Sequence, residues 1–451
     1  MQRARIRPLL IAALTLWGSA CAGEDSVEEG VVTRTLDNGM EVLVKRDRRA
    51  PVVTTMVWYR VGAVDERAGQ TGLSHVLEHM MFKGTPEVGP GELSEIIARN
   101  GGKENAFTGQ DYTAYFERIA ADRLEVPLRL EADRMMNLTL DPAEFDKERQ
   151  VVMEERRLRV TDDPRSRAQE VLRSVAFDAH SYGHPVIGWM QDLETMEVAD
   201  LESWYERYYG PANARLVVVG DVAPKRVFRL AKKHFGDLPA RGEVPPVDPG
   251  PGPANGGDRQ VDLTGDARVP YLVAGYRVPN LPEAVKDWMP FALRIAAGLL
   301  SEGRSARLPA RLVREQGVAT SAGAHYSPAS RAPGLFYLEA IPADASLADL
   351  QAALAAQVAD LRDQTPSEAE LDRVKRQIAA SEVFDRDAIF YQAMEIGKLE
   401  TIGYGHAYAD DYLERIRAVT PEQVRKAAAK YLVPQRRTLV RLHPDDKEGA
   451  E

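Results

Sequence analysis

The order of apolar and polar positions in the first half of the chain predicts strands first and helices afterwards. Residues 42–44 and 52–61 are rich in β-branched and aromatic side chains, and the first stretch follows an Asp-Asn-Gly turn, so both predict strands. Further along, apolar residues recur every three to four positions. This period predicts helices over residues 72–82, 91–100, 121–137 and 142–160.

The second half follows the same plan. Strand signals recur at residues 271–276 and 336–340, and helical patterns cover residues 367–382 and 388–401. A helix ending at Tyr208, a turn at Pro211 and an apolar strand reappear 223 residues later around Tyr431 and Pro434. Because each copy closes one half of the chain, the repeat indicates two duplicated domains.

A stretch dense in proline and glycine, residues 241–257, separates the halves and predicts a linker. The expected organisation is a leader over residues 1–22, an N-terminal domain over 23–240, the linker, and a C-terminal domain over 258–451. Strands and helices do not alternate strictly, so the fold class is α+β. We expect two similar tandem, α/β-sandwich-like domains, each a mainly antiparallel sheet with packed helices.

The leader has the pattern of an export signal. Three arginines precede the apolar run of residues 9–17, and small residues follow. Cys21, the only cysteine, stands where a lipoprotein carries its lipid, although Gly18 replaces the usual leucine. Cleavage after Ala22 is the alternative. Both imply an exported, periplasmic protein, and a lipid on Cys21 would anchor it to the membrane. One cysteine cannot form a disulfide within the chain.

Composition narrows the class of protein. The chain has 451 residues, of which 44% are hydrophobic and 28% charged, as in ordinary soluble proteins of two or three domains. The formal net charge of −10 argues against a nucleic-acid partner. No apolar run beyond the first 20 residues has the length of a membrane span.

Residues 75–79 read HVLEH, the inverted zinc motif H-x-x-E-H. On a helix, His79 lies about 40° from His75 around the axis, and Glu78 lies about 60° to the other side. Two neutral imidazoles at this spacing can bind one Zn²⁺, and the adjacent carboxylate can accept a proton from water. The motif therefore predicts a metallopeptidase with one zinc ion per chain, in which Glu78 is the catalytic residue. The alternative is an amphipathic helix whose polar residues face solvent.

A catalytic zinc usually has three protein ligands, so a third must come from elsewhere in the chain. The helix expected after the N-cap Asp141 offers Glu148, Glu154 and Glu155. Glu148 and Glu155 face the same way but stand about 10 Å apart along the axis, so both do not easily bind one ion. Spacing alone does not choose among the three carboxylates.

Three stretches of the first half resemble the pitrilysin/insulinase family of zinc metallopeptidases, the inverzincins. They resemble in particular the mitochondrial processing peptidase β-subunit and its short bacterial relatives. The stretches are residues 72–85 (GLSHVLEHMMFKGT), residues 105–108 (NAFT) with Asp111, Thr113 and Tyr115, and residues 148–155 (ERQVVMEE). They follow the family's order and spacing. The resemblance implies a processing-peptidase-like pair of domains over residues 30–445.

The resemblance also implies the roles of individual residues. The last glutamate of the third stretch is the family's metal ligand, which assigns the metal to His75, His79 and Glu155, with Glu148 as a supporting carboxylate. The segment Asn105-Ala106-Phe107 corresponds to a strand edge beside the metal. An extended substrate peptide adds to this edge, and Asn105 can hydrogen-bond the peptide near the scissile bond.

The second half carries no metal motif, and the resemblance is thinner there. Longer family members place an arginine and a tyrosine from this half in the site. Arg314 matches the arginine and is assigned to substrate binding, whereas the tyrosine position holds Thr320 or Val318, and Tyr326 lies off the pattern. Short members resemble one half of a clamshell. We therefore expect a homodimer, or a heterodimer with a metal-free homologue, enclosing the peptide.

Three functions compete on this basis. The first is a zinc endopeptidase that hydrolyses extended peptides or unfolded segments by a metal-activated water, with Glu78 as general base. The second is a non-catalytic, peptide-binding subunit of a heterodimeric peptidase of the same fold. The third is a zinc hydrolase of another class, such as an amidase. The complete motif favours the first over the second, and a strand edge suited to extended peptides disfavours the third.

Overall fold

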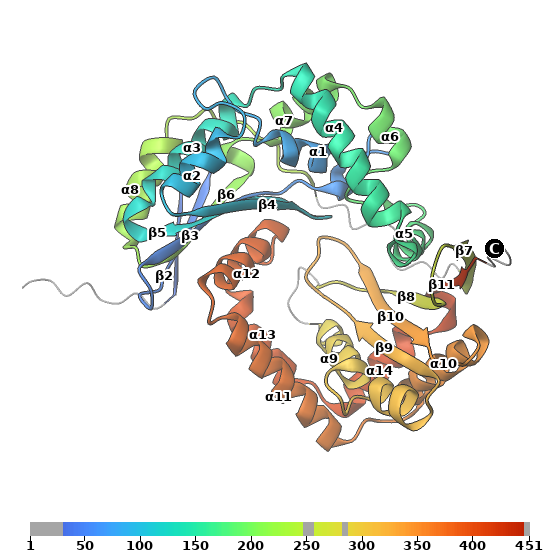
Figure 1. Ribbon diagram of the computed structural model, residues 1–451. Coiled ribbons are helices and arrows are strands. Elements are labelled where there is room, and N and C mark those ends of the chain that lie inside the picture. The colour runs from blue at the N-terminus through green and yellow to red at the C-terminus, as the bar shows by residue number, and fades with distance from the viewer. Residues whose placement is uncertain (1–29, 247–256, 282–286, 446–451) are drawn as a thin grey trace, which may run out of the picture.

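The computed structural model describes residues 30–246, 257–281 and 287–445. The predicted leader with Cys21, and residues 247–256 of the predicted linker, lie outside these residues. The described chain forms two sheets, one before the linker and one after it, each with packed helices (Figure 1). The α+β class is therefore confirmed, and the predicted domain boundaries stay predictions.

The first sheet has six strands in the order β1-β2-β6-β3-β5-β4, and only β2 and β6 run parallel. The second has five strands in the order β7-β11-β8-β10-β9, and only β7 and β11 run parallel. The orders β2-β6-β3-β5-β4 and β7-β11-β8-β10-β9 match strand for strand, which confirms the predicted pair of similar, mainly antiparallel domains. The strands are β1 (Val31–Thr35), β2 (Glu41–Arg46), β3 (Val52–Tyr59), β4 (Lys103–Thr108), β5 (Thr113–Ala120), β6 (Ala214–Gly220), β7 (Arg259–Gly265), β8 (Tyr271–Val278), β9 (Ala319–His325), β10 (Gly334–Pro342) and β11 (Arg437–Pro444).

The helices lie close to their predicted positions. The helix expected over residues 121–137 begins with a 3-10 turn, and the helix expected over 142–160 ends in a π turn at Arg157–Thr161. The first half contains α1 (Leu73–Met80), α2 (Glu92–Arg99), α3 (Glu125–Asn137), α4 (Pro142–Arg156), α5 (Pro164–Ala176), α6 (Met190–Thr195), α7 (Val198–Tyr208) and α8 (Pro224–Phe235). The second contains α9 (Met289–Ser301), α10 (Leu347–Asp363), α11 (Glu368–Asp385), α12 (Ile389–Ile402), α13 (Tyr408–Ala418) and α14 (Pro421–Tyr431).

The strands β2, β3 and β6 in the middle of the first sheet are buried on both faces. Side chains alternate along a strand, so Val42 and Val44 of β2 join the core under the helices, while Leu43 between them points the other way. The opposite face, with Met56 and Trp58 of β3, is covered by α12. Burial on both faces explains why these strands have apolar runs instead of clean alternation.

The two halves exchange helices. α12 from the second half packs on β3 and β6, and α5 from the first half packs on β8 and β11. The offset of 223 residues that relates Tyr208 to Tyr431 brings α5 to within about three residues of α12, so the exchange follows the repeat. At Gly397 of α12, an added Cβ would lie 2.1 Å from Nε1 of Trp58, so this contact requires glycine.

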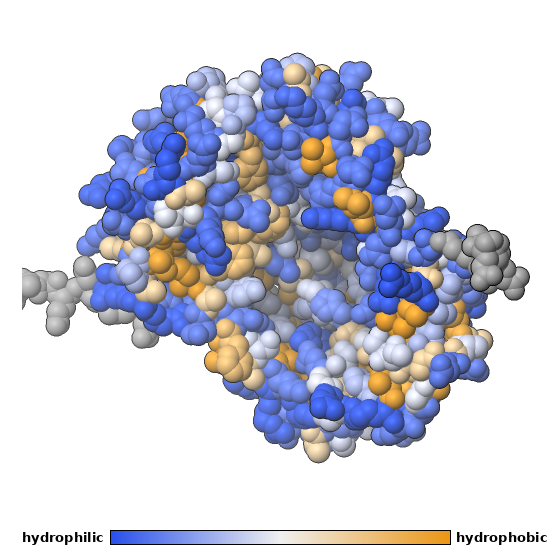
Figure 2. Space-filling view, in the orientation of Figure 1, coloured by the Kyte–Doolittle hydropathy of each residue, from blue (hydrophilic) through white to orange (hydrophobic). Residues whose placement is uncertain are grey.

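The face of the molecule between the two halves is hollowed (Figure 2). β4 is the last strand of the first sheet on this side, and β9 is the last strand of the second. In the described part of the chain, no helix is long and apolar enough to cross a membrane.

Candidate metal centre

The helix α1 presents the predicted motif on one side only. Leu73, Val76, Leu77 and Met80 are buried in the core, whereas the side chains of the HVLEH motif that carry nitrogen or oxygen point away from it. α1 packs against α4, α7 and β4. The motif therefore faces a space bounded by another helix and by the edge of the sheet.

The helix α4 supplies the carboxylates. It begins at Asp141, whose side chain accepts hydrogen bonds from the backbone N–H groups of Ala143 (2.9 Å) and Glu144 (3.0 Å), as its sequence predicts. Because α4 lies along α1, Glu148 faces His79, and Glu155, two turns later, faces both histidines.

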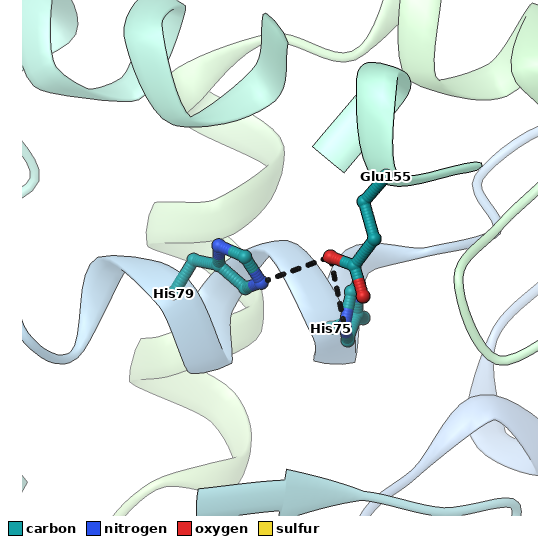
Figure 3. A group of neighbouring side chains, drawn as sticks. All are labelled: His75, His79 and Glu155. Carbon is teal, nitrogen blue, oxygen red and sulfur yellow. Dashed lines mark ion pairs between the residues drawn. The ribbon is translucent and has the colours of Figure 1, made fainter. Parts of the chain in front are cut away.

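His75, His79 and Glu155 converge on one point (Figure 3). Glu155 Oε2 lies 3.6 Å from His79 Nε2 and 4.0 Å from His75 Nε2, and one ligand atom from each residue lies within 4.8 Å of the others. The three side chains are 13–23% exposed. Within the described residues, no other three His, Cys, Asp or Glu side chains come together in this way.

The donor set suits zinc. Ligand atoms about 2.0–2.1 Å from a tetrahedral zinc stand roughly 3.3 Å apart, so small side-chain shifts bring these three to binding distance. Two imidazoles and one carboxylate, with room for water, are the ligands typical of catalytic zinc in peptidases.

Glu148 orients His79. Its Oε2 lies 3.1 Å from His79 Nδ1, and its other oxygen forms an ion pair with Lys83. A carboxylate only accepts hydrogen bonds, so Nδ1 carries the proton and Nε2 keeps the lone pair that a metal needs. Glu148 therefore contacts one of the two histidines but is not among the three converging side chains, and its supporting role stays a prediction.

His75 is kept neutral by its surroundings. Burial, together with the nearby His79 and Arg159, lowers the pKa of His75 from 6.5 to about 3. The folded, zinc-free protein therefore holds this imidazole unprotonated throughout the neutral and mildly acidic range. A neutral imidazole is the form that binds metal.

This shift predicts how the zinc-free protein responds to acid. The unfolded chain binds a proton at His75 near pH 6.5 and the folded chain only near pH 3, so the free energy of unfolding falls as the pH drops between these values. Between pH 7 and pH 5 the loss from His75 is about 2 kcal/mol. Urea unfolding of chelator-treated wild type and His75→Gln at both pH values measures it. Equal losses in the two proteins would contradict the assignment.

Glu78 stands apart from the three converging side chains. Its carboxylate accepts a hydrogen bond from the hydroxyl of Thr108 on β4. Burial raises the pKa of Glu78, while the Thr108 hydrogen bond opposes the rise. A raised pKa makes a carboxylate a stronger base, which suits the predicted exchange of protons with water.

The segment predicted to bind substrate forms the outer strand β4. Asn105 is exposed, and its side-chain oxygen accepts a hydrogen bond from the Ala106 N–H at 2.8 Å. Phe107 packs edge-on against Trp58, with ring centroids 5.4 Å apart. β4 pairs with β5 on one side only, so its other edge is open for an added strand.

The structure does not bring Arg314 to this centre. Arg314 is exposed in a π-helical turn, Leu308–Glu315, and its guanidinium donates to the carbonyl of Arg304 in the same half. Thr320 bonds the Ile341 carbonyl, and Tyr326 is buried with its hydroxyl on the Pro279 carbonyl. A substrate-binding role for Arg314 stays a prediction. The tyrosine position of longer family members holds Thr320 or Val318 here, and the nearby Tyr326 hydroxyl is bound to the Pro279 carbonyl.

Three side chains of the centre were not assigned from the sequence. Lys83 pairs with Glu148, Thr108 bonds Glu78, and Arg159 pairs with Glu155. A sequence signal exists for Arg159, which lies four residues after Glu155 within the helix predicted over residues 142–160 and so shares a face with it. Lys83 lies beyond the end of α1 at Met80, so helix spacing does not predict its contact with Glu148. Thr108 lies within the NAFT stretch, but only the fold shows that its hydroxyl reaches Glu78.

Two protein-family models match parts of the chain. Residues 41–188 match the family model described as insulinase (peptidase family M16), and residues 195–378 match the peptidase M16 inactive domain. The second match begins at the end of α6 in the first half and ends within α11 of the second half.

Several of the matching relatives are named zinc proteases. The chain is 33% identical over 344 residues to the zinc protease PqqE of Helicobacter pylori, covering 76% of this chain and 77% of that protein. It is 28% identical to the mitochondrial-processing peptidase subunit beta of Blastocladiella emersonii, covering 93% and 90%. The crystal structure of a protease from Helicobacter pylori superposes with a TM-score of 0.87 at 29% identity, covering 92% of this chain and 100% of that one.

Proposed function

The chain belongs to the insulinase family, peptidase family M16, and on this basis we propose that it is a zinc-dependent endopeptidase. The observation that carries the proposal is the convergence of His75, His79 and Glu155 beside a separate, half-buried carboxylate, Glu78. A centre built only for structural zinc would have four protein ligands and no such base.

His75 Nε2, His79 Nε2 and Glu155 Oε2 would hold the ion. Bound there, zinc supplies Lewis-acid polarisation of the peptide carbonyl and lowers the pKa of a water molecule. Arg159, paired with the outer oxygen of Glu155, and Glu148, bonded to His79, hold two of the ligands in orientation.

Glu78 moves the proton. Its carboxylate accepts a proton from the attacking water and then delivers it to the nitrogen of the leaving amine, which must be protonated to depart. The hydroxyl and the backbone N–H of Thr108 both donate to this carboxylate and hold it in place. Because Thr108 lies on β4, the strand that would bind the substrate also positions the base.

The substrate class follows from β4. An extended peptide can add to its open edge through backbone hydrogen bonds, which do not depend on sequence. In the structure Asn105 occupies the Ala106 N–H, so its side chain must turn away as a peptide strand pairs there. The freed carboxamide is then available to bond the peptide backbone near the scissile bond. Folded proteins offer few free strands, so peptides and unfolded segments are the expected substrates.

A paired arrangement supports this chemistry. β4 is the outer strand of its sheet and pairs only with β5 among the described strands, and an open, wet site weakens electrostatic contributions to catalysis. We infer that two chains, or this chain and a metal-free homologue, close over the peptide. Specific activity is then expected to fall on dilution in step with dissociation seen by sedimentation. Constant specific activity from a demonstrably monomeric protein would rule out the paired form.

The site of action is inferred from the leader. We propose export to the periplasm, with Cys21 as lipid anchor. Cys21→Ala is then expected to move the protein from the membrane fraction to the soluble periplasmic fraction. An unchanged distribution of wild type and variant, both soluble, would instead support ordinary cleavage after Ala22.

The direct test of the function is digestion of a peptide library by the purified protein, with and without a chelator. Cleavage at internal bonds that stops on chelation and returns with zinc is the expected result. Tight binding of peptides without cleavage would favour the alternative, a non-catalytic peptide-binding subunit.

A further inference from the structure

The helix α1, which carries both histidines, has no side-chain cap at its N-cap residue. Its N-cap is Gly72, with φ of 91°, which has no side chain to accept the free N–H groups at the start of the helix. Glu66 accepts them instead: its Oε2 bonds the Gly72 N–H at 2.7 Å and its Oε1 bonds the Ser74 N–H at 2.8 Å. Glu66 is only 2% exposed, so water does not replace these bonds. Ser74 directly precedes the ligand His75.

The segment that carries Glu66 is fixed from the second half of the chain. Its neighbour Asp65 forms a two-pronged ion pair with Arg331, with distances of 2.8 and 2.9 Å. Both side chains are buried: that of Arg331 is 3% exposed and that of Asp65 is 7% exposed. A planar guanidinium bound through two nitrogens fixes the direction of its partner as well as the distance.

Arg331 also fixes the hairpin that joins β4 to β5. Its backbone N–H donates to Asp111 Oδ2 at 3.2 Å, and the Tyr182 hydroxyl donates to the other oxygen of Asp111 at 2.6 Å. This hairpin carries the strand on which Thr108 bonds Glu78. One residue of the metal-free half therefore contacts both segments that flank the metal centre, the turn before α1 and the hairpin of β4.

We propose that Glu66 and Arg331 are positioning residues for the metal centre, through which the metal-free half holds α1 and its histidines in binding geometry. The proposal rests on the zinc site of the proposed function, but not on peptidase activity. It assigns a task to the second half that does not depend on contact with substrate.

Zinc affinity is the property to measure, by competition with a chromophoric chelator. Glu66→Gln keeps the shape but turns an amide N–H₂ towards one of the two helix N–H donors, so one bond is lost and two donors oppose each other. Arg331→Lys keeps the charge but loses the two-pronged contact. Each single variant is expected to bind zinc about tenfold more weakly, the lower end of what outer partners of metal ligands contribute.

The double variant separates a shared role from two independent ones. If Arg331 acts through the segment that carries Glu66, the two losses do not add. The double variant is then expected to bind zinc about as weakly as the weaker-binding single variant. Faster amide exchange of residues 72–80 in the zinc-free variants is the accompanying sign of a loosened α1. If Glu66→Gln does not fold, Arg331→Lys, which keeps the buried charge, tests the same prediction alone.

Leu350→Ala is the matched control. Leu350 is fully buried in the second core, on α10, so its truncation lowers the melting temperature without touching the turn before α1. Zinc affinity is expected to stay at the wild-type value in this control. Wild-type affinity in Glu66→Gln and Arg331→Lys, or an equal loss in Leu350→Ala, would overturn the positioning role. Absence of zinc binding by the wild type would overturn the proposed function as well.

Discussion

Glu78→Gln is expected to abolish peptide cleavage while the protein keeps its zinc. Glutamine has the size of glutamate and can still accept the Thr108 hydrogen bond, so the site keeps its shape. It cannot accept a proton at neutral pH. Loss of a general base typically costs about a hundredfold to ten-thousandfold in rate, which places the variant near the detection limit of most peptide assays.

Two measurements on the same preparation check this result. Elemental analysis is expected to find as much zinc in the variant as in wild type, because Glu78 is not among the three converging side chains. The rate at which the variant cleaves a peptide from the library screen is expected to fall about a hundredfold to ten-thousandfold. A large loss of zinc would mean that Glu78 is itself a ligand, and the assignment of the base would then be wrong.

Glu155→Ala is expected to lose both zinc and activity, whereas Glu154→Ala loses neither. The two residues differ by about 100° around α4, so only one can face α1. Glu155 faces both imidazoles and is 17% exposed, while Glu154 is 57% exposed and pairs with Arg157. Removing one of three ligands leaves two histidines, which hold the ion far more weakly.

Glu154→Ala is the matched control, because it removes the same atoms from the preceding position of the same helix. Zinc content by elemental analysis and cleavage rate are compared in the two variants. A zinc-free Glu154→Ala, or a fully loaded Glu155→Ala, would show that the register taken from the family resemblance is shifted by one residue.

The fold could largely be predicted from apolar periodicity, and the repeat at 223 residues predicted the two similar sheets. The exchange of α5 and α12 could not be predicted. An apolar stripe shows that a helix is covered, but not which sheet covers it. Gly397 gave no signal either, since the need for glycine depends on Trp58, which lies more than three hundred residues earlier in the chain.

The place of the two histidines and Glu78 in the site could be predicted from local spacing, since residues i and i+4 share a face of any helix. The third carboxylate did not, because spacing places a residue around its own helix and not relative to another one. The structure shows what separates the three candidates: Glu148 faces Nδ1 of His79, Glu154 faces solvent, and Glu155 faces both imidazoles. The resemblance to the family selected the same residue from its pattern.

Glu66 and Arg331 had no signal in the sequence. A carboxylate six residues before a helix is common in loops, and the ion pair between Asp65 and Arg331 spans 266 positions. Contacts of this kind depend on how the two halves close on each other. They are therefore visible only once both sheets and the turns between them are placed.

Titration of the zinc-free protein with zinc tests the central claim most directly. Protein stripped by a chelator is supplied with increasing amounts of zinc, and cleavage of a library peptide is measured at each step. The account predicts that activity is absent at the start and rises linearly to a break at one zinc per chain. Activity that survives the removal of zinc, or one tightly bound zinc per chain with no cleavage of any peptide, would contradict it.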